Sequence, residues 1–240
     1  MELGGETASI PSVVVHMHSS ENMSEVADGA AKLFMGPSVF LGKGVPWSEY
    51  AKLYDTVYNK EGRRILRSDG VFVVIQTNAY ADGEFICRYR LLLDVLDAGG
   101  WQLLDERVWQ RRRADHFQLP FSHVLIFIPP GGTMRRAALN KNTDWFQGVW
   151  NYPQTKGGPH AGYPAELCRL LVNACTGPGD LIVDPFAGTA QLLAVAADND
   201  RRAIGYEIDD ALLPIIHGNG VATLKDGTLT VPAKRGFFNG

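Results

Sequence analysis

The chain has 240 residues, of which 45% are hydrophobic and 20% are charged, and its formal net charge is −3. This composition is typical of an ordered globular protein and excludes a disordered or fibrous chain. The three cysteines form no CxxC pair, which excludes an encoded disulfide framework or cysteine zinc cluster. Without an 18-residue apolar run, and with an acidic start, the sequence predicts no membrane contact and a cytoplasmic location.

Short β-branched runs alternate with amphipathic stretches along the chain, which is the pattern of an α/β sheet. In chain order, the patterns predict strands at residues 13–15, 31–35, 71–75, 101–109, 122–128, 181–183 and 203–207. They predict helices at residues 46–66, 84–96, 164–175 and 189–199. Residues 67–70 are expected to form a turn, 129–164 a structured loop, and the last twenty residues a hairpin.

The segment 181–209 reads as a strand, a tight glycine-containing turn, a helix and a second strand that ends at an acid. Gly188 would let the backbone approach a ligand, and the helix that follows would point its first N–H groups at it. Glu207 stands about twenty residues beyond the turn, where a carboxylate can accept both hydroxyls of a ribose. The unit therefore indicates a nucleotide-type site. The alternative is a generic βαβ unit in which Glu207 is a surface residue.

The residues of this unit carry a resemblance to a known family. The segment 184–190 (DPFAGTA) resembles the DPF.GSG cofactor motif of the amino-methylating DNA methyltransferases, and 205–209 (GYEID) resembles the strand that follows it there. Upstream, 160–167 (HAGYPAEL) and 150–153 (WNYP) are similar to the family's segments before that motif. Residues 64–72, 108–110 and 122–127 resemble its earlier elements in the same order.

The resemblance covers residues 30–210 and has the circularly permuted motif order of the family's β group. It implies a Rossmann-like α/β fold for S-adenosyl-L-methionine, with a seven-stranded, mostly parallel sheet and one reversed hairpin. The chain would be one methyltransferase domain, with a catalytic half (30–128), a short recognition segment (129–160), a cofactor half (161–216) and a C-terminal hairpin (217–240). The residues it assigns to the cofactor are Asp184, Pro185, Phe186, Gly188, Thr189, Glu207, Tyr163, Pro164 and His160.

The family's catalytic motif, [D/N/S]-P-P-[Y/F/W], is altered here. Its first side chain and a proline carbonyl accept hydrogen bonds from an exocyclic amine, and its aromatic ring stacks on the flipped base. At the corresponding place Gly36 replaces the acceptor, Ser38 the second proline and Val39 the aromatic, and Pro37 alone matches. A rebuilt site would use the carbonyls of Gly36 or Pro37, Ser38 as acceptor, and Phe40 or Trp47 for stacking. Ala190 also replaces the second glycine of the cofactor motif, and Gln191 the residue after it.

Three functions remain open on this sequence. The first is an S-adenosylmethionine-dependent DNA methyltransferase acting on cytosine N4 or adenine N6. The second is a cofactor-binding pseudoenzyme that pairs with an active methyltransferase or regulates one. The third is methylation of a modified base, an RNA or a small molecule, for which the amine clamp is not needed.

Basic residues are concentrated in residues 107–141, which carry seven Lys or Arg against one Asp. Such an excess favours phosphate binding, although a solvated loop has the same composition. The candidate DNA contacts are Arg111, Arg112, Arg113, Arg135 and Arg136. Because the recognition segment is short, a homodimer or a partner methyltransferase subunit is a further possibility. His16 and His18 form an HxH pair for which the sequence indicates no third metal ligand.

Overall fold

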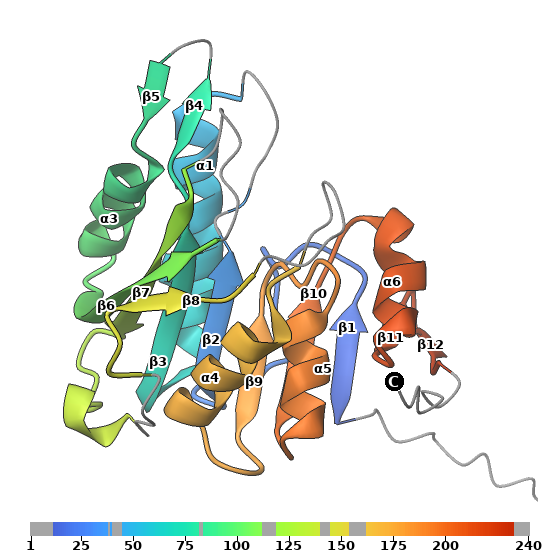
Figure 1. The fold of residues 1–240 in the computed structure, drawn as a ribbon. Coiled ribbons are helices and arrows are strands. Elements are labelled where there is room, and N and C mark those ends of the chain that lie inside the picture. Colours follow the sequence, from blue (N-terminus) through green and yellow to red (C-terminus); the bar gives the residue numbers. More distant parts are fainter. Residues whose placement is uncertain are drawn as a thin grey trace, which may run out of the picture.

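The computed structural model describes residues 12–37, 39, 45–81, 84–111, 119–139, 145–153 and 162–232, with the side chains of 79–81 left aside. Its main sheet has the strand order β12-β11-β1-β10-β9-β2-β3-β7-β6-β8 (Figure 1). The strands of this sheet are β1 (Val13–His16), β2 (Ala31–Pro37), β3 (Leu66–Gln76), β6 (Gln102–Gln110), β7 (Phe121–Ile128), β8 (Val149–Asn151), β9 (Leu181–Asp184), β10 (Arg202–Tyr206), β11 (Ala222–Lys225) and β12 (Thr228–Thr230). A separate hairpin pairs β4 (Ala79–Ala81) with β5 (Glu84–Ile86).

The helices flank the sheet on both faces (Figure 1). They are α1 (Trp47–Tyr54), α2 (Arg63–Ile65), α3 (Arg88–Ala98), α4 (Ala165–Cys175), α5 (Gln191–Asp198) and α6 (Leu213–Gly218). On β2, Leu33 and Met35 pack with α4 and α5, whereas Phe34 between them packs with α1 and α3. This alternation is the two-residue period of a strand that is buried on both faces. In the part of the chain that the structure describes, no helix is long and apolar enough to span a bilayer.

The predicted α/β class is confirmed, but the predicted number of strands was wrong. Seven consecutive strands, from β1 to β6 in the sheet order, form the expected core, and β7 is the reversed strand because it runs antiparallel to both β3 and β6. Two further strands, β11 and β12, extend one end of the sheet, and β8 extends the other. The short strand β8 lies in the expected loop, where three paired residues leave no readable hydrophobic period.

Two boundaries also differ from the prediction. The expected turn at 67–70 belongs to β3, where pairing passes from Ala31↔Leu66 to Leu33↔Val71, so β3 accommodates the extra residues as an irregularity. Residues 84–86 pair in the β4–β5 hairpin, so the helix begins only at Arg88. The helix expected at 46–66 forms, with a π-helical stretch at Asp55–Gly62 between α1 and α2.

The topology brings the ends of two strands from distant parts of the chain together. β2 and β9 are parallel neighbours, and they end at Pro37 and Asp184 respectively. In open α/β sheets, ligands bind in the crevice at the carboxyl ends of the strands. The loop after β9 leads directly into α5, so both the strand end and the helix start face this edge of the sheet.

Ala190, the residue before α5, has a left-handed backbone conformation with φ = 57°. This conformation costs a residue with a Cβ about 1–2 kcal/mol, and glycine has no such penalty. We predict that Ala190→Gly raises the free energy of unfolding by about 0.5–1 kcal/mol, measured by urea denaturation. As a control, Ala194→Gly within α5 lowers it by about 1 kcal/mol or more. A loss of stability in Ala190→Gly would contradict the backbone conformation described here.

Candidate functional site

A cavity of about 280 Å³ opens at the carboxyl edge of the sheet. Residues from both halves of the chain line it: Pro37, Gly162, Tyr163, Asp184, Phe186, Ala187, Gly188, Thr189, Gln191, Leu192 and Leu212. The wall combines apolar side chains with one carboxylate and the backbone of a glycine turn. This combination is typical of a small-molecule site, in which apolar surface supplies affinity and a few polar groups fix orientation.

Asp184 is the charged group of this cavity. It is only 3% exposed, and its Oδ1 accepts a hydrogen bond from the backbone N–H of Phe186 at 3.0 Å. Burial raises the pKa of its carboxyl to about 7, and the negative charge of Glu207 adds to the increase, against the lowering effect of the Phe186 N–H. A buried carboxyl group with a raised pKa is stabilised in its ionised form by a cationic ligand group beside it.

The turn after β9 is fastened to the end of β10. Ala187 donates its N–H to the carbonyl of Tyr206 at 2.8 Å, and Gly188, with φ = +54°, donates its N–H to Oε2 of Glu207 at 2.8 Å. Oε1 of Glu207 accepts the N–H groups of Ile208 and Asp209 at 2.8 and 2.9 Å. Glu207 is therefore oriented by three backbone donors, directly after β10 and against the glycine turn. These bonds fix the direction of its carboxylate beside the glycine turn.

The second half of the cavity wall comes from the segment before α4. Tyr163 lines the cavity, with its ring edge-on to Trp109 at 6.0 Å between centroids. A Cβ at position 162 would lie 2.4 Å from Oγ1 of Thr189, so a side chain there would force Thr189 to shift. Pro164 is buried at the start of α4, where its carbonyl accepts the N–H of Cys168. His160 lies outside the described residues.

The altered catalytic segment meets the cofactor-motif turn directly. A Cβ at Gly36 would lie 3.0 Å from Cγ of Pro185 and 3.4 Å from the hydroxyl of Tyr58. That hydroxyl donates a hydrogen bond to the carbonyl of Pro37 at 2.9 Å. Burial raises the pKa of Tyr58 well above its usual range, so the hydroxyl remains a neutral donor. Pro185 and Tyr58 thus occupy the space in which the family's acceptor side chain would begin. Ser38 and Phe40 lie outside the described residues.

The structure gives no support for three of the five arginines as DNA contacts. Arg111 is buried, with its guanidinium bonded to the carbonyls of Leu119 and Phe121. Arg135 and Arg136 follow β7, which runs antiparallel to β3 and so ends at the sheet edge opposite the cavity, where Thr133 donates its N–H to the carbonyl of Ser68 near the start of β3. Arg136 is also paired there with Asp105 at 3.0 Å. Charge content alone could not show these placements. Arg112 and Arg113 lie outside the described residues.

Several lining residues were not assigned from the sequence. Leu192 and Leu212 are apolar residues whose periodicity indicates only burial, and Gln191 was noted only as a departure from the family motif. Tyr58 sits in the π-helical stretch, stacked on Tyr54 at 5.1 Å. Helical spacing predicted that it faces the core, but its contact with Pro37 depends on how the helix packs across β2. No local signal in the sequence could have revealed that contact.

Comparison with known proteins gives the family. Residues 47–217, more than half of the chain, match the DNA methylase family N6_N4_Mtase. The type II methyltransferase M.MjaI of Methanocaldococcus jannaschii is 35% identical over 115 residues, which are 41% of this chain and 38% of that protein. M.Cfr9I of Citrobacter freundii is 37% identical over 135 residues, or 50% of this chain and 45% of that protein. The matches span less than half the length of these relatives.

Solved structures agree on the fold. A putative DNA modification methylase from Thermus thermophilus, solved with S-adenosyl-L-methionine, superposes with a TM-score of 0.69 at 19% identity, covering 85% of this chain and 92% of that one. The cytosine-N4-specific PvuII DNA methyltransferase gives 0.70 at 17% identity, covering 90% and 96%. The chain belongs to the DNA methylase family, and the predicted family membership and fold are confirmed.

The raised pKa of Asp184 predicts a stability cost. Between about pH 4 and pH 7 the folded protein keeps a proton that the unfolded chain has lost, so the free energy of unfolding falls as pH rises. Asp184→Asn removes the ionisable group and with it this fall in the free energy of unfolding. We predict that, without ligand, the variant is at least as stable as the wild type at about pH 8 and that the difference shrinks towards about pH 5, measured by urea denaturation. The exposed Asp200→Asn serves as control, and an Asp184→Asn protein less stable at the higher pH would contradict the assignment.

Proposed function

We propose that this protein is an S-adenosylmethionine-dependent DNA methyltransferase that acts on an exocyclic amine, cytosine N4 or adenine N6. The observation that carries the proposal is the cavity shared by Asp184 and Pro37, which brings the cofactor motif and the remnant of the catalytic motif to one point. Family membership supports the same activity. When bound, S-adenosylmethionine supplies an electrophilic methyl group on a sulfonium.

The residues of the cavity fit that cofactor. The buried carboxyl of Asp184 is suited to the α-ammonium group, because a neighbouring positive charge offsets the cost of ionising it in a buried position. Glu207 is suited to the ribose hydroxyls. A carboxylate has about four acceptor sites, and three are used by backbone N–H groups, so holding both hydroxyls requires one of these three bonds to open. Ile208 beside it is 75% exposed and offers an apolar surface to a purine.

The amine would be held by a reduced set of acceptors. The carbonyl of Pro37 has two lone pairs, and the Tyr58 hydroxyl uses one of them, which leaves one for an amine hydrogen and fixes the carbonyl's direction. Gly36 provides no side-chain acceptor. The loss of one such hydrogen bond costs about 1–3 kcal/mol of alignment, which slows transfer about 5- to 150-fold without abolishing it. We assign the second acceptor to Ser38 and base stacking to Phe40.

DNA would approach the edge at which the cavity opens. Gln110 and Phe121, the described ends of β6 and β7, lie at this edge, and they flank the chain segment that contains Arg112 and Arg113. We therefore retain these two arginines as candidate phosphate contacts. Because Arg135 and Arg136 lie at the other edge, we further propose that a second copy of the chain, or a partner methyltransferase subunit, supplies part of the DNA contact.

The test is methyl transfer from labelled S-adenosylmethionine to unmethylated DNA, with RNA in parallel, followed by digestion to nucleosides and mass spectrometry. We expect N4-methylcytosine or N6-methyladenine in DNA, at a level that falls to background in Asp184→Asn. Cofactor binding without any methylated nucleoside would contradict the proposed activity and support the pseudoenzyme. Product in RNA alone would contradict DNA as the substrate.

The contact between Gly36 and Pro185 makes a second prediction. Restoring the family's acceptor with Gly36→Asn forces Pro185 to move, and overpacking of this kind costs about 1–3 kcal/mol. We expect the variant to bind S-adenosylmethionine about tenfold more weakly and to show no gain in methyl transfer, measured by titration calorimetry and the assay above. Gly148→Asn is the control, because a Cβ there meets nothing within 4 Å. Unchanged affinity in Gly36→Asn would contradict this account of the substitution.

A further inference from the structure

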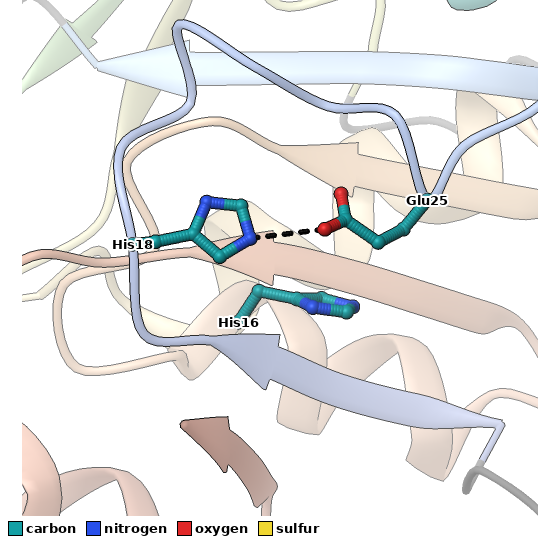
Figure 2. A group of neighbouring side chains, drawn as sticks. All are labelled: His16, His18 and Glu25. Carbon is teal, nitrogen blue, oxygen red and sulfur yellow. Dashed lines mark hydrogen bonds and ion pairs between the residues drawn. The ribbon is translucent and has the colours of Figure 1, made fainter. Parts of the chain in front are cut away.

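Two histidines and a glutamate converge beside the end of β1, outside the cavity (Figure 2). His16 is the last residue of β1, whereas His18 and Glu25 come from the segment that leads from β1 to β2. Each side chain offers one ligand atom, and these atoms all lie within 4.8 Å of one another. Among the described residues, this is the group of His, Cys, Asp and Glu side chains that converges in this way.

The geometry is close to that of a metal site. Nε2 of His18 and Oε1 of Glu25 are 3.1 Å apart, as the dashed line in Figure 2 shows. In a tetrahedral zinc site with bonds of about 2.1 Å, neighbouring ligand atoms are about 3.4 Å apart. Closing the group around an ion therefore needs a movement of about 1 Å. His18 and Glu25 have room for this movement, because their side chains are 40% and 34% exposed. His16 is only 4% exposed and is held in place by its neighbours.

The surroundings of the three residues resemble an outer shell of metal ligands. Tyr206 donates its hydroxyl hydrogen to Oε2 of Glu25 at 3.2 Å, and its ring stacks on His16 at 5.5 Å between centroids. Such partners fix the orientation of metal ligands.

We propose that His16, His18 and Glu25 bind one divalent transition-metal ion of the Zn²⁺ class, with water completing the coordination. Two imidazoles and a carboxylate form a ligand set that suits zinc and excludes a Ca²⁺ or Mg²⁺ site built from oxygen ligands. The HxH spacing in the sequence offered two ligands. The third, Glu25, lies seven residues after His18, and the fold of the intervening segment brings it beside the two histidines.

The role that this position supports is structural. The segment after β1 covers Tyr206 and Val183 with Met23 and Val26, at a place where the sheet has no crossover helix between β1 and β2. The carbonyl of His16 also accepts the N–H of Glu207 at 3.1 Å. An ion held by the three side chains would fasten this segment to the sheet next to Glu207. The inference does not depend on the proposed methyl transfer.

The test uses the full chain without a histidine tag, stripped of metal, and titrated with Zn²⁺ and with Co²⁺ alone. We expect one ion per chain by calorimetry, a Co²⁺ absorption spectrum of a low-coordinate site, and a Tm about 4 °C or more higher with saturating Zn²⁺. His18→Ala and Glu25→Gln, both at partly exposed positions, should each weaken Zn²⁺ binding about 100-fold or more.

His217→Ala is the matched control, because it removes an imidazole that is bonded to Thr223 and is not one of the three proposed ligands. Binding in this variant should equal that of the wild type. The proposal is overturned if the metal-free protein takes up no stoichiometric Zn²⁺, or if His18→Ala and Glu25→Gln bind it as well as the wild type. Either result can be read whether or not the protein methylates DNA.

Discussion

The removal of the Asp184 carboxyl group from water is the constraint on which the rest of the site depends. An ionised carboxylate in such a position is costly unless a positive charge or hydrogen-bond donors compensate it. Among the described residues, the donor to Asp184 is the backbone N–H of Phe186. The surrounding structure keeps this group at the end of β9 nevertheless. The glycine turn, the left-handed Ala190 and the fastening of Glu207 all hold the backbone around an open space beside it. The site is therefore preorganised for a cation at some expense of stability.

The packing around position 36 makes a side chain there costly. A Cβ at position 36 would lie 3.0 Å from Cγ of Pro185 and 3.4 Å from the Tyr58 hydroxyl, so Pro185 would have to shift to admit a side chain. The π-helical stretch sets the position of Tyr58, and π-helical turns are frequent at functional sites. Gly36 and the hydrogen bond from Tyr58 to the carbonyl of Pro37 therefore belong to the same closely packed region.

The sequence predicted those parts of the molecule that local patterns control. Strands such as β3 and β7 show as apolar runs, and the turn at 184–190 shows as a run of Asp, Pro and Gly between a strand and a helix. What depended on distant packing could not be predicted. The Tyr58–Pro37 contact, the position of Leu212 in the cavity wall and the return of Glu25 to His18 all join residues through the fold. Charge counts likewise say nothing about where a side chain lies, since Arg111 is buried and Arg136 is paired with Asp105.

In the proposed function, the cavity at Asp184 receives S-adenosylmethionine through a cationic group. Titration calorimetry in buffers of different ionisation enthalpy measures the protons released on binding. If a cation meets Asp184, binding at about pH 6 releases close to one proton per chain, the release declines towards zero by about pH 8, and Asp184→Asn shows none. Absence of binding, or the same proton release in Asp184→Asn, would contradict the claim.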